Sequence, residues 1–131
     1  MNIGIIGTGY VGLTTGTCLA EVGHQVICVD SDAEKVRLLQ AGGLPIYEPQ
    51  LPDLVQRNVA AGRLTFAQSV KEAVQASDIV FIAVPTPPQP DGSVDLSCLE
   101  AVAREIAACL TSYKVVVEKS TVPVKTGEKV A

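Results

Sequence analysis

Histidine is almost absent from this chain of 131 residues, and its scarcity excludes a common class of site. His24 is the single histidine, so the sequence has no H-x-x-x-H pair, and it has no cluster of cysteines either. Metal sites need several such ligands, and we therefore predict none. His24 follows Gly23 at a predicted helix end, where a cation is mildly favourable, which indicates a structural role.

Long apolar runs and basic clusters are also missing. No apolar run approaches the roughly 20 residues that a membrane-spanning helix needs. The apolar N-terminus lacks the basic region of a signal peptide. The net charge is -4, without a run of Lys or Arg, which argues against nucleic acid as a partner. We therefore expect a cytoplasmic protein that binds neither nucleic acid nor a membrane.

The cysteines show no recognisable spacing. No C-x-x-C motif occurs, and all four stand in apolar stretches, which predicts small core residues in a reducing compartment. These residues are Cys18, Cys28, Cys98 and Cys109. Because 47% of the residues are hydrophobic and only 18% are charged, disorder is excluded, and the length suits one domain with its own core.

The first thirty residues are the most informative part of the chain. Apolar runs at 3–6 and 26–29 predict two strands buried on both faces. Between them lie Gly7, Gly9 and Gly12 in the spacing G-x-G-x-x-G, and a helical pattern that ends at Gly23. The second apolar run is followed directly by Asp30.

This order of residue types is typical of a dinucleotide site. Gly7 permits a tight turn, Gly9 lets the backbone approach a pyrophosphate, and Gly12 lets the helix pack closely. The amide groups and the positive end of the helix favour a phosphate. Asp30 follows the glycine motif at the usual sequence spacing for a carboxylate that bonds ribose hydroxyls. Its charge would repel a 2′-phosphate, which predicts NAD rather than NADP. The alternative is a glycine-punctuated helix in another α/β protein.

The rest of the chain alternates helical and apolar segments. Helices are predicted at about 33–40, 53–61, 69–75 and 95–110, and strands at 63–66, 78–84 and 115–117. Three prolines at 44–52 predict an irregular loop. The predicted fold is α/β: a doubly wound parallel sheet in three layers, α/β/α. In the last long helix the apolar positions are predicted to be core: Leu96, Leu99, Val102, Ile106 and Leu110.

Ligands of such sheets bind beyond the carboxyl ends of the strands. The segment 85–92 follows a predicted strand and is therefore placed to touch the cofactor, with Thr86 as the candidate hydroxyl donor. The alternative is that this segment is only a rigid turn into the next helix. Lys35 lies on the first turn of the predicted helix, near the expected position of the ribose. It is either a cofactor contact or a solvated helix lysine. Residues 118–123 follow the last strand and face the same crevice.

Four motifs together resemble one family. They occur in the order seen in the UDP-glucose dehydrogenase family, which also holds UDP-N-acetylmannosamine and GDP-mannose dehydrogenases. The motifs are Gly-Thr-Gly-Tyr-Val-Gly-Leu at 7–13, Ile-Tyr-Glu-Pro at 46–49, Val-Pro-Thr-Pro at 84–87 and Lys-Ser-Thr-Val-Pro at 119–123. The resemblance implies a Rossmann NAD(P)-binding fold. It also implies the NAD-dependent oxidation of a nucleotide sugar's primary alcohol to a carboxylate, with two hydrides passing to two NAD molecules.

The resemblance also implies roles for individual residues. Thr121 would help to position a water, and Glu48 would lie close to cofactor and substrate. The implied cofactor contacts are Gly7, Gly9, Tyr10, Val11, Gly12, Asp30, Lys35, Val84, Thr86, Pro87, Ser120 and Thr121. Gln50 and Lys125 depart from the family's glycines, which affects local loop shape.

The family's catalytic cysteine lies in a glycine-rich motif beyond position 131. We therefore interpret residues 1–131 as an NAD-binding domain of a longer enzyme, and we expect it to bind NAD without oxidising sugar. For the full-length enzyme the resemblance implies a homodimer or a larger assembly. Thr8, Val11 and Thr14 resemble UDP-glucose enzymes more than UDP-N-acetylmannosamine ones. Two alternatives stay open: a non-catalytic NAD-sensing regulatory domain, and a hydroxy-acid dehydrogenase of the 6-phosphogluconate type.

Overall fold

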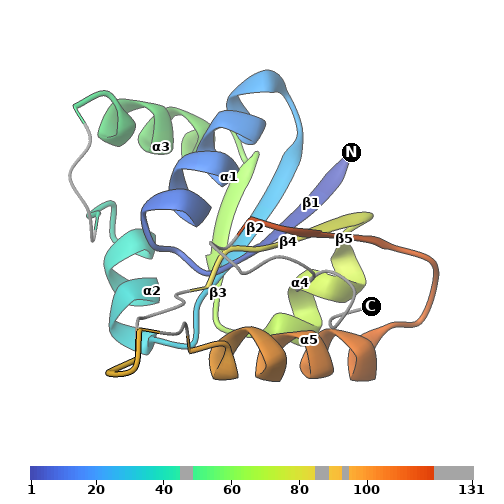
Figure 1. Ribbon diagram of the computed structural model, residues 1–131. Helices are drawn as coiled ribbons and strands as arrows, with labels where there is room; N and C mark the ends of the chain where they lie inside the picture. Colours follow the sequence, from blue (N-terminus) through green and yellow to red (C-terminus); the bar gives the residue numbers. More distant parts are fainter. Residues whose placement is uncertain (45–48, 85–88, 93–94, 120–131) are drawn as a thin grey trace.

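A five-stranded parallel sheet forms the centre of the structure (Figure 1). The computed structural model describes residues 1–44, 49–84, 89–92 and 95–119. The strand order is β3-β2-β1-β4-β5, so the first strand of the chain lies in the middle. The strands are β1 (Asn2–Ile6), β2 (Gln25–Val29), β3 (Leu64–Ala67), β4 (Ile79–Ile82) and β5 (Val115–Glu118).

Helices cover both faces of this sheet. In Figure 1, α1 and α3 lie on one side of the strands, and α4 and α5 lie on the other. None of the helices within the described ranges is long and apolar enough to cross a membrane. The helices are α1 (Tyr10–Val22), α2 (Ala33–Gln40), α3 (Leu51–Ala60), α4 (Val70–Ala76) and α5 (Ser97–Cys109). The predicted doubly wound, three-layer α/β/α fold is therefore confirmed.

The central strands are apolar on both faces because both faces carry a core. Ile3 and Ile5 of β1 pack in the cluster that includes Leu13 of α1, whereas Ile6 packs in the opposite cluster with Val74 of α4. Side chains alternate between faces along a strand, so a strand covered on both sides has no polar alternation. This explains why the apolar run at 3–6 indicated a buried strand.

Local signals explain the ends of α1, α2 and α4, which lie within one residue of their predicted bounds. The first helix ends at Gly23, which has a φ of 122°. The Asp32 carboxylate accepts hydrogen bonds from the amides of Glu34 and Lys35 at the start of α2, and the Ser69 hydroxyl caps α4.

The start of α3 differs from the prediction. The helix begins at Leu51 rather than near 53, and Pro52 lies in its first turn. A proline is tolerated at this position because the first amides of a helix have no partner within the helix.

The prediction that the cysteines are core residues is wrong for two of them. Cys28 of β2 is buried, but Cys18 and Cys98 are exposed and Cys109 is half-buried. Both exposed residues lie on helices, where an apolar neighbour in sequence does not share the same face. Leu110 is also 44% exposed rather than core, because α5 ends at Cys109 and the chain turns to an extended conformation there.

Candidate cofactor site at the carboxyl edge of the sheet

The glycine turn between β1 and α1 is packed against two other parts of the chain. Gly7 has a φ of 106°, and a Cβ there would lie 2.3 Å from the carbonyl oxygen of Ala83, just after β4. A Cβ on Gly12 would lie 1.9 Å from the carbonyl oxygen of Gly7. Any side chain at either position would displace the backbone, so both glycines are required for the shape of the turn.

Gly9 has a different role in the same turn. A Cβ at this position would meet nothing within 4 Å, so the glycine opens onto free space. Gly9 is the N-cap of α1, where no side chain caps the helix, and the first turn carries no acidic residue. The positive end of the helix dipole therefore points at an open approach that suits an anion.

Asp30 lies at the end of β2, beside the glycine turn. Its Oδ2 atom accepts hydrogen bonds from the Thr8 hydroxyl at 2.7 Å and the Thr8 amide at 3.0 Å. Its Oδ1 atom accepts from the Asp32 amide at 2.9 Å, and Lys35 Nζ lies 4.0 Å from Oδ2. Burial raises the pKa of the carboxyl, but these hydrogen bonds and the lysine charge outweigh it and hold the pKa of Asp30 below its usual value. The group is an anion at neutral pH.

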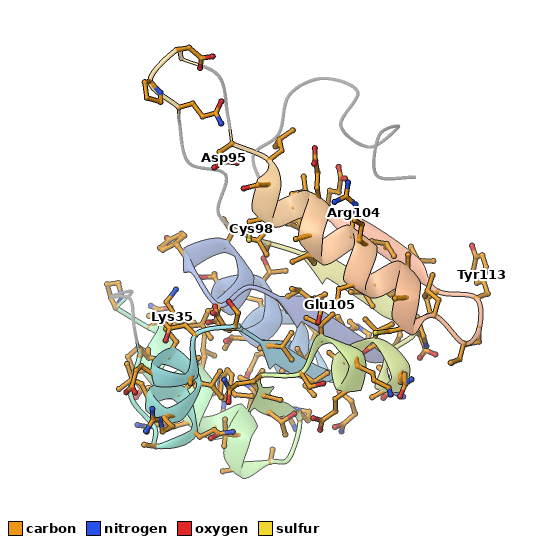
Figure 2. All side chains as sticks on the ribbon, turned by 90° about the horizontal axis from the view of Figure 1, so that it is seen from below. Lys35, Asp95, Cys98, Arg104, Glu105 and Tyr113 are labelled. Atoms are coloured by element: carbon orange, nitrogen blue, oxygen red, sulfur yellow. The ribbon has the colours of Figure 1, made fainter. Side chains whose placement is uncertain are left out.

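A cavity of about 220 Å³ lies at the same edge of the sheet. Its inner wall is apolar, and Asp30, Lys35, Gln68 and Glu105 supply polar groups. Figure 2 shows Lys35 on α2, and Cys98 and Glu105 on α5. The lining residues are Ile6, Gly7, Val29, Asp30, Ser31, Lys35, Gln68, Val70, Val84, Cys98, Val102 and Glu105.

These features fit a dinucleotide. The turn offers an uncapped helix start and open space to a pyrophosphate, the Asp30 carboxylate offers acceptors to a ribose, and the cavity offers apolar walls to a flat base. All three lie at the carboxyl ends of β1, β2 and β4. β1 and β4 are the neighbouring strands at which the chain reverses its direction across the sheet, and open parallel sheets bind ligands at this position.

The structure brings together only part of the predicted site. Gly7, Asp30, Lys35 and Val84 line one cavity, and Gly9 and Gly12 belong to the turn beside it. Tyr10 and Val11 begin α1 and are 56% and 45% exposed. The other predicted site residues lie outside the described residues, and their roles stay predictions: Glu48, Thr86, Pro87, Ser120 and Thr121. Among the residues that the structure describes, no group of three His, Cys, Asp or Glu could hold a metal ion.

Sequence reasoning missed several residues of this edge. It assigned the apolar stripe of α5 to the core, yet Val102 lines the cavity together with Cys98 and Glu105. The available signal was the position of α5 after β4, which brings its first turns to the carboxyl edge of the sheet. Thr8 was considered only as a mark of family resemblance, although a hydroxyl within a glycine turn can bond to the acid that follows the next strand.

Comparisons with known proteins identify the family. A sequence model of the UDP-glucose/GDP-mannose dehydrogenase family, NAD binding domain, matches residues 1–131. The chain is 53% identical over 129 residues to the UDP-glucose 6-dehydrogenase TuaD of Bacillus subtilis (strain 168), covering 98% of this chain and 28% of the relative. It is 56% identical over 131 residues to the UDP-glucose 6-dehydrogenase of Rhizobium meliloti (strain 1021), covering 99% and 30%.

A solved structure agrees with this assignment. The ternary complex of GDP-mannose dehydrogenase from Pseudomonas aeruginosa superimposes with a TM-score of 0.95 and 41% identity, over 99% of this chain and 30% of that one. The chain thus spans less than a third of the length of the relatives it matches. The cofactor that the glycine turn and Asp30 predicted is the one in the description of the family, NAD. The chain belongs to the UDP-glucose/GDP-mannose dehydrogenase family and corresponds to its NAD-binding domain.

Proposed function

We propose that this chain is the N-terminal cofactor domain of a UDP-glucose 6-dehydrogenase. The full-length enzyme would oxidise UDP-glucose to UDP-glucuronate, with two NAD molecules as acceptors. The substrate assignment is supported by identities of 53% and 56% to two UDP-glucose 6-dehydrogenases, against 41% to a GDP-mannose dehydrogenase. The family membership favours a dehydrogenase and leaves the regulatory NAD-sensing alternative without support.

One observation carries the assignment of the cofactor site. The open, uncapped start of α1 at Gly9 and the ionised carboxylate of Asp30 lie at the same edge of the sheet. A pyrophosphate would lie against residues 7–12, close to Tyr10 and Val11. The adenosine ribose would then reach Asp30 and Lys35, with Val84 in the wall of the adjoining cavity.

Asp30 would bind the ribose as a hydrogen-bond acceptor. The same negative charge would repel a 2′-phosphate, because the Asp30 side chain is only 13% exposed and solvent screens its charge little. Bound NAD would supply the hydride acceptor for both oxidation steps. In this chain, Thr86 and Pro87 would line the cofactor, and Ser120 and Thr121 would lie near the nicotinamide, with Thr121 positioning a water.

The remaining chemistry belongs to parts of the enzyme outside this chain. Glu48 would lie close to the substrate, while the thiol nucleophile and most of the sugar contacts would come from the other domains. We further propose that the enzyme works as a homodimer or larger assembly in the cytoplasm, with a role in polysaccharide biosynthesis.

The direct test is an assay of the full-length protein with NAD. NADH formation would be followed with UDP-glucose, GDP-mannose and UDP-N-acetylmannosamine in parallel. Two NADH formed for each UDP-glucose consumed would establish both the reaction and the substrate. Preference for GDP-mannose or UDP-N-acetylmannosamine would assign the protein to another substrate class of the same family. No turnover with any of them, in protein that still binds NAD, would refute the dehydrogenase assignment.

A further inference from the structure

Thr8 connects the glycine turn to Asp30 through two hydrogen bonds to one oxygen atom. Thr8 is 1% exposed, although it lies between Gly7 and Gly9 in a turn that opens to solvent. Its hydroxyl does not cap α1, which has no side-chain cap. Instead it donates to Asp30 Oδ2 at 2.7 Å, beside the Thr8 amide at 3.0 Å.

We propose that Thr8 is a positioning residue that fixes the orientation of the Asp30 carboxylate and thereby sets the preference of the site for NAD over NADP. The proposal rests on the ribose-binding role proposed for Asp30 above. Thr8 itself would not touch the ribose.

Counting acceptors shows what the pair of bonds achieves. A carboxylate has about four lone-pair sites on its two oxygens. The two Thr8 donors occupy Oδ2, and the Asp32 amide occupies one site of Oδ1. The remaining acceptor site is therefore on Oδ1, and its direction is fixed by Thr8 and Asp32 together. A ribose hydroxyl meets an acceptor that is already oriented, which reduces the entropy lost on binding.

The same bonds favour the charged form of the carboxylate and fix its orientation. Without the Thr8 hydroxyl, Asp30 could rotate away from an incoming phosphate, which would relieve the repulsion of NADP. The charged and titratable groups near this carboxylate are Lys35 and Asp32 at the start of α2, and Cys98 and Glu105 of α5, which line the same cavity. Lys35 is 41% exposed and 4.0 Å away, so its attraction is screened more than the buried Thr8 bonds are.

The test compares Thr8→Val with Thr8→Ser in the full-length protein. Valine keeps the shape of threonine but removes the hydroxyl, whereas serine keeps the hydroxyl. We expect Thr8→Val to bind NAD about tenfold more weakly and to lose much of its discrimination against NADP. We expect the pH at which NAD binding is half lost in acid to move upward, because the pKa of Asp30 rises. Thr8→Ser should behave as wild type in all three measurements.

Thr17→Val is the matched control. The Thr17 hydroxyl is buried in α1 and donates to the carbonyl of Leu13 at 2.7 Å, away from Asp30. Its removal should leave unchanged the ratio of the NAD and NADP affinities and the pH at which NAD binding is half lost in acid. If Thr17→Val moved them as far as Thr8→Val did, the effect would be general destabilisation and the proposal would be wrong.

A double-mutant cycle with Asp30→Ala separates this proposal from the function proposed above. If Thr8 acts through Asp30, Thr8→Val has no further effect on NAD affinity once Asp30 is alanine. An equal loss in both backgrounds would overturn the role of Thr8 while leaving the cofactor site intact. Wild-type protein that bound no NAD would refute the proposed function instead. Should Thr8→Val fail to fold, Thr8→Ala against Thr8→Ser gives the same comparison.

Discussion

At the scale of single residues, the glycines of the turn divide into those that shape it and one that keeps it open. An added Cβ would meet a backbone oxygen at Gly12 and empty space at Gly9. We expect Gly12→Ala to destabilise the fold by about 3 kcal/mol through overpacking. Gly9→Ala should cost only about 1 kcal/mol, since its φ of -73° suits any residue and the loss is that of a poorer N-cap, but should weaken NAD binding about tenfold.

Thermal unfolding and calorimetric titration with NAD would check this pair of variants. Gly12→Ala should mainly lower the unfolding temperature, whereas Gly9→Ala should mainly lower the affinity for NAD. Unchanged NAD affinity in a stable Gly9→Ala protein would show that the pyrophosphate does not approach this part of the turn.

The cysteines offer a second residue-scale test, because burial separates them. Desolvation raises the pKa of the Cys28 thiol to about 12, and the residue is fully buried, so it should resist labelling in the native protein. Cys18 and Cys98 are exposed and should react. Only Cys98 lines the cavity, so saturating NAD should slow its labelling and leave Cys18 unaffected.

Mass spectrometry of maleimide-treated protein, with and without NAD, would resolve the individual sites. Equal protection of Cys18 and Cys98 would indicate a general tightening of the fold. Absence of protection at Cys98 would place NAD away from this cavity.

At the scale of elements, a polar network holds α3 against α1. Arg57 of α3 donates two hydrogen bonds to Glu21 of α1, at 2.6 and 3.2 Å. The buried Asn58 also donates to Glu21, at 2.7 Å, and accepts from Arg63 at 3.1 Å. The network thus fixes the helix that follows the proline-rich loop to the helix that begins at the glycine turn.

This network should make part of the stability depend on pH. The hydrogen bond from Asn58, and then that from Arg57, lower the pKa of Glu21 below its ordinary value of 4.5. Since the pKa is lower in the folded state, the stabilisation is fully present above 4.5 and is lost as the pH falls through the folded-state value. Glu21→Gln removes this ionisation.

We therefore expect the gap in unfolding free energy between wild type and Glu21→Gln to be largest at neutral pH and to shrink below 4.5. Urea unfolding at a series of pH values would measure it. Arg37→Gln is a suitable comparison, because Arg37 pairs with exposed Glu34 within α2. A gap that stayed constant with pH would show that Glu21 titrates as an unpaired carboxyl.

At the scale of the whole molecule, cofactor binding and turnover should be separable. The glycine turn, Asp30 and the cavity that fit NAD are all formed by this chain. The chain covers only about 30% of the length of the relative from Rhizobium meliloti. We expect the 131-residue polypeptide to bind NAD and to form no NADH with UDP-glucose, while the full-length protein does both. Turnover by the isolated polypeptide would contradict the proposal that the nucleophile lies outside these 131 residues.

The sequence predicted the sheet and the cofactor turn well because both depend on local patterns. The apolar runs, the glycine spacing and Asp30 are read within thirty residues, and the structure confirms the elements they predicted. The bond from Thr8 to Asp30, the exposure of Cys98 and the place of Glu105 in the cavity were not predicted. Each depends on how separate elements meet in space, and residue order alone does not specify such contacts.

The contact of Gly7 with Ala83 has a consequence for synthesis. A ribosome makes the whole glycine fingerprint and Asp30 early, but the wall against which the turn rests arrives only with β4. Until then β1, the middle strand of the finished sheet, has one open edge and is prone to pair with other chains. A nascent chain released after β2 would carry the complete motif and still not bind coenzyme. Capture on immobilised NAD would therefore report translation past β4 rather than the presence of the motif.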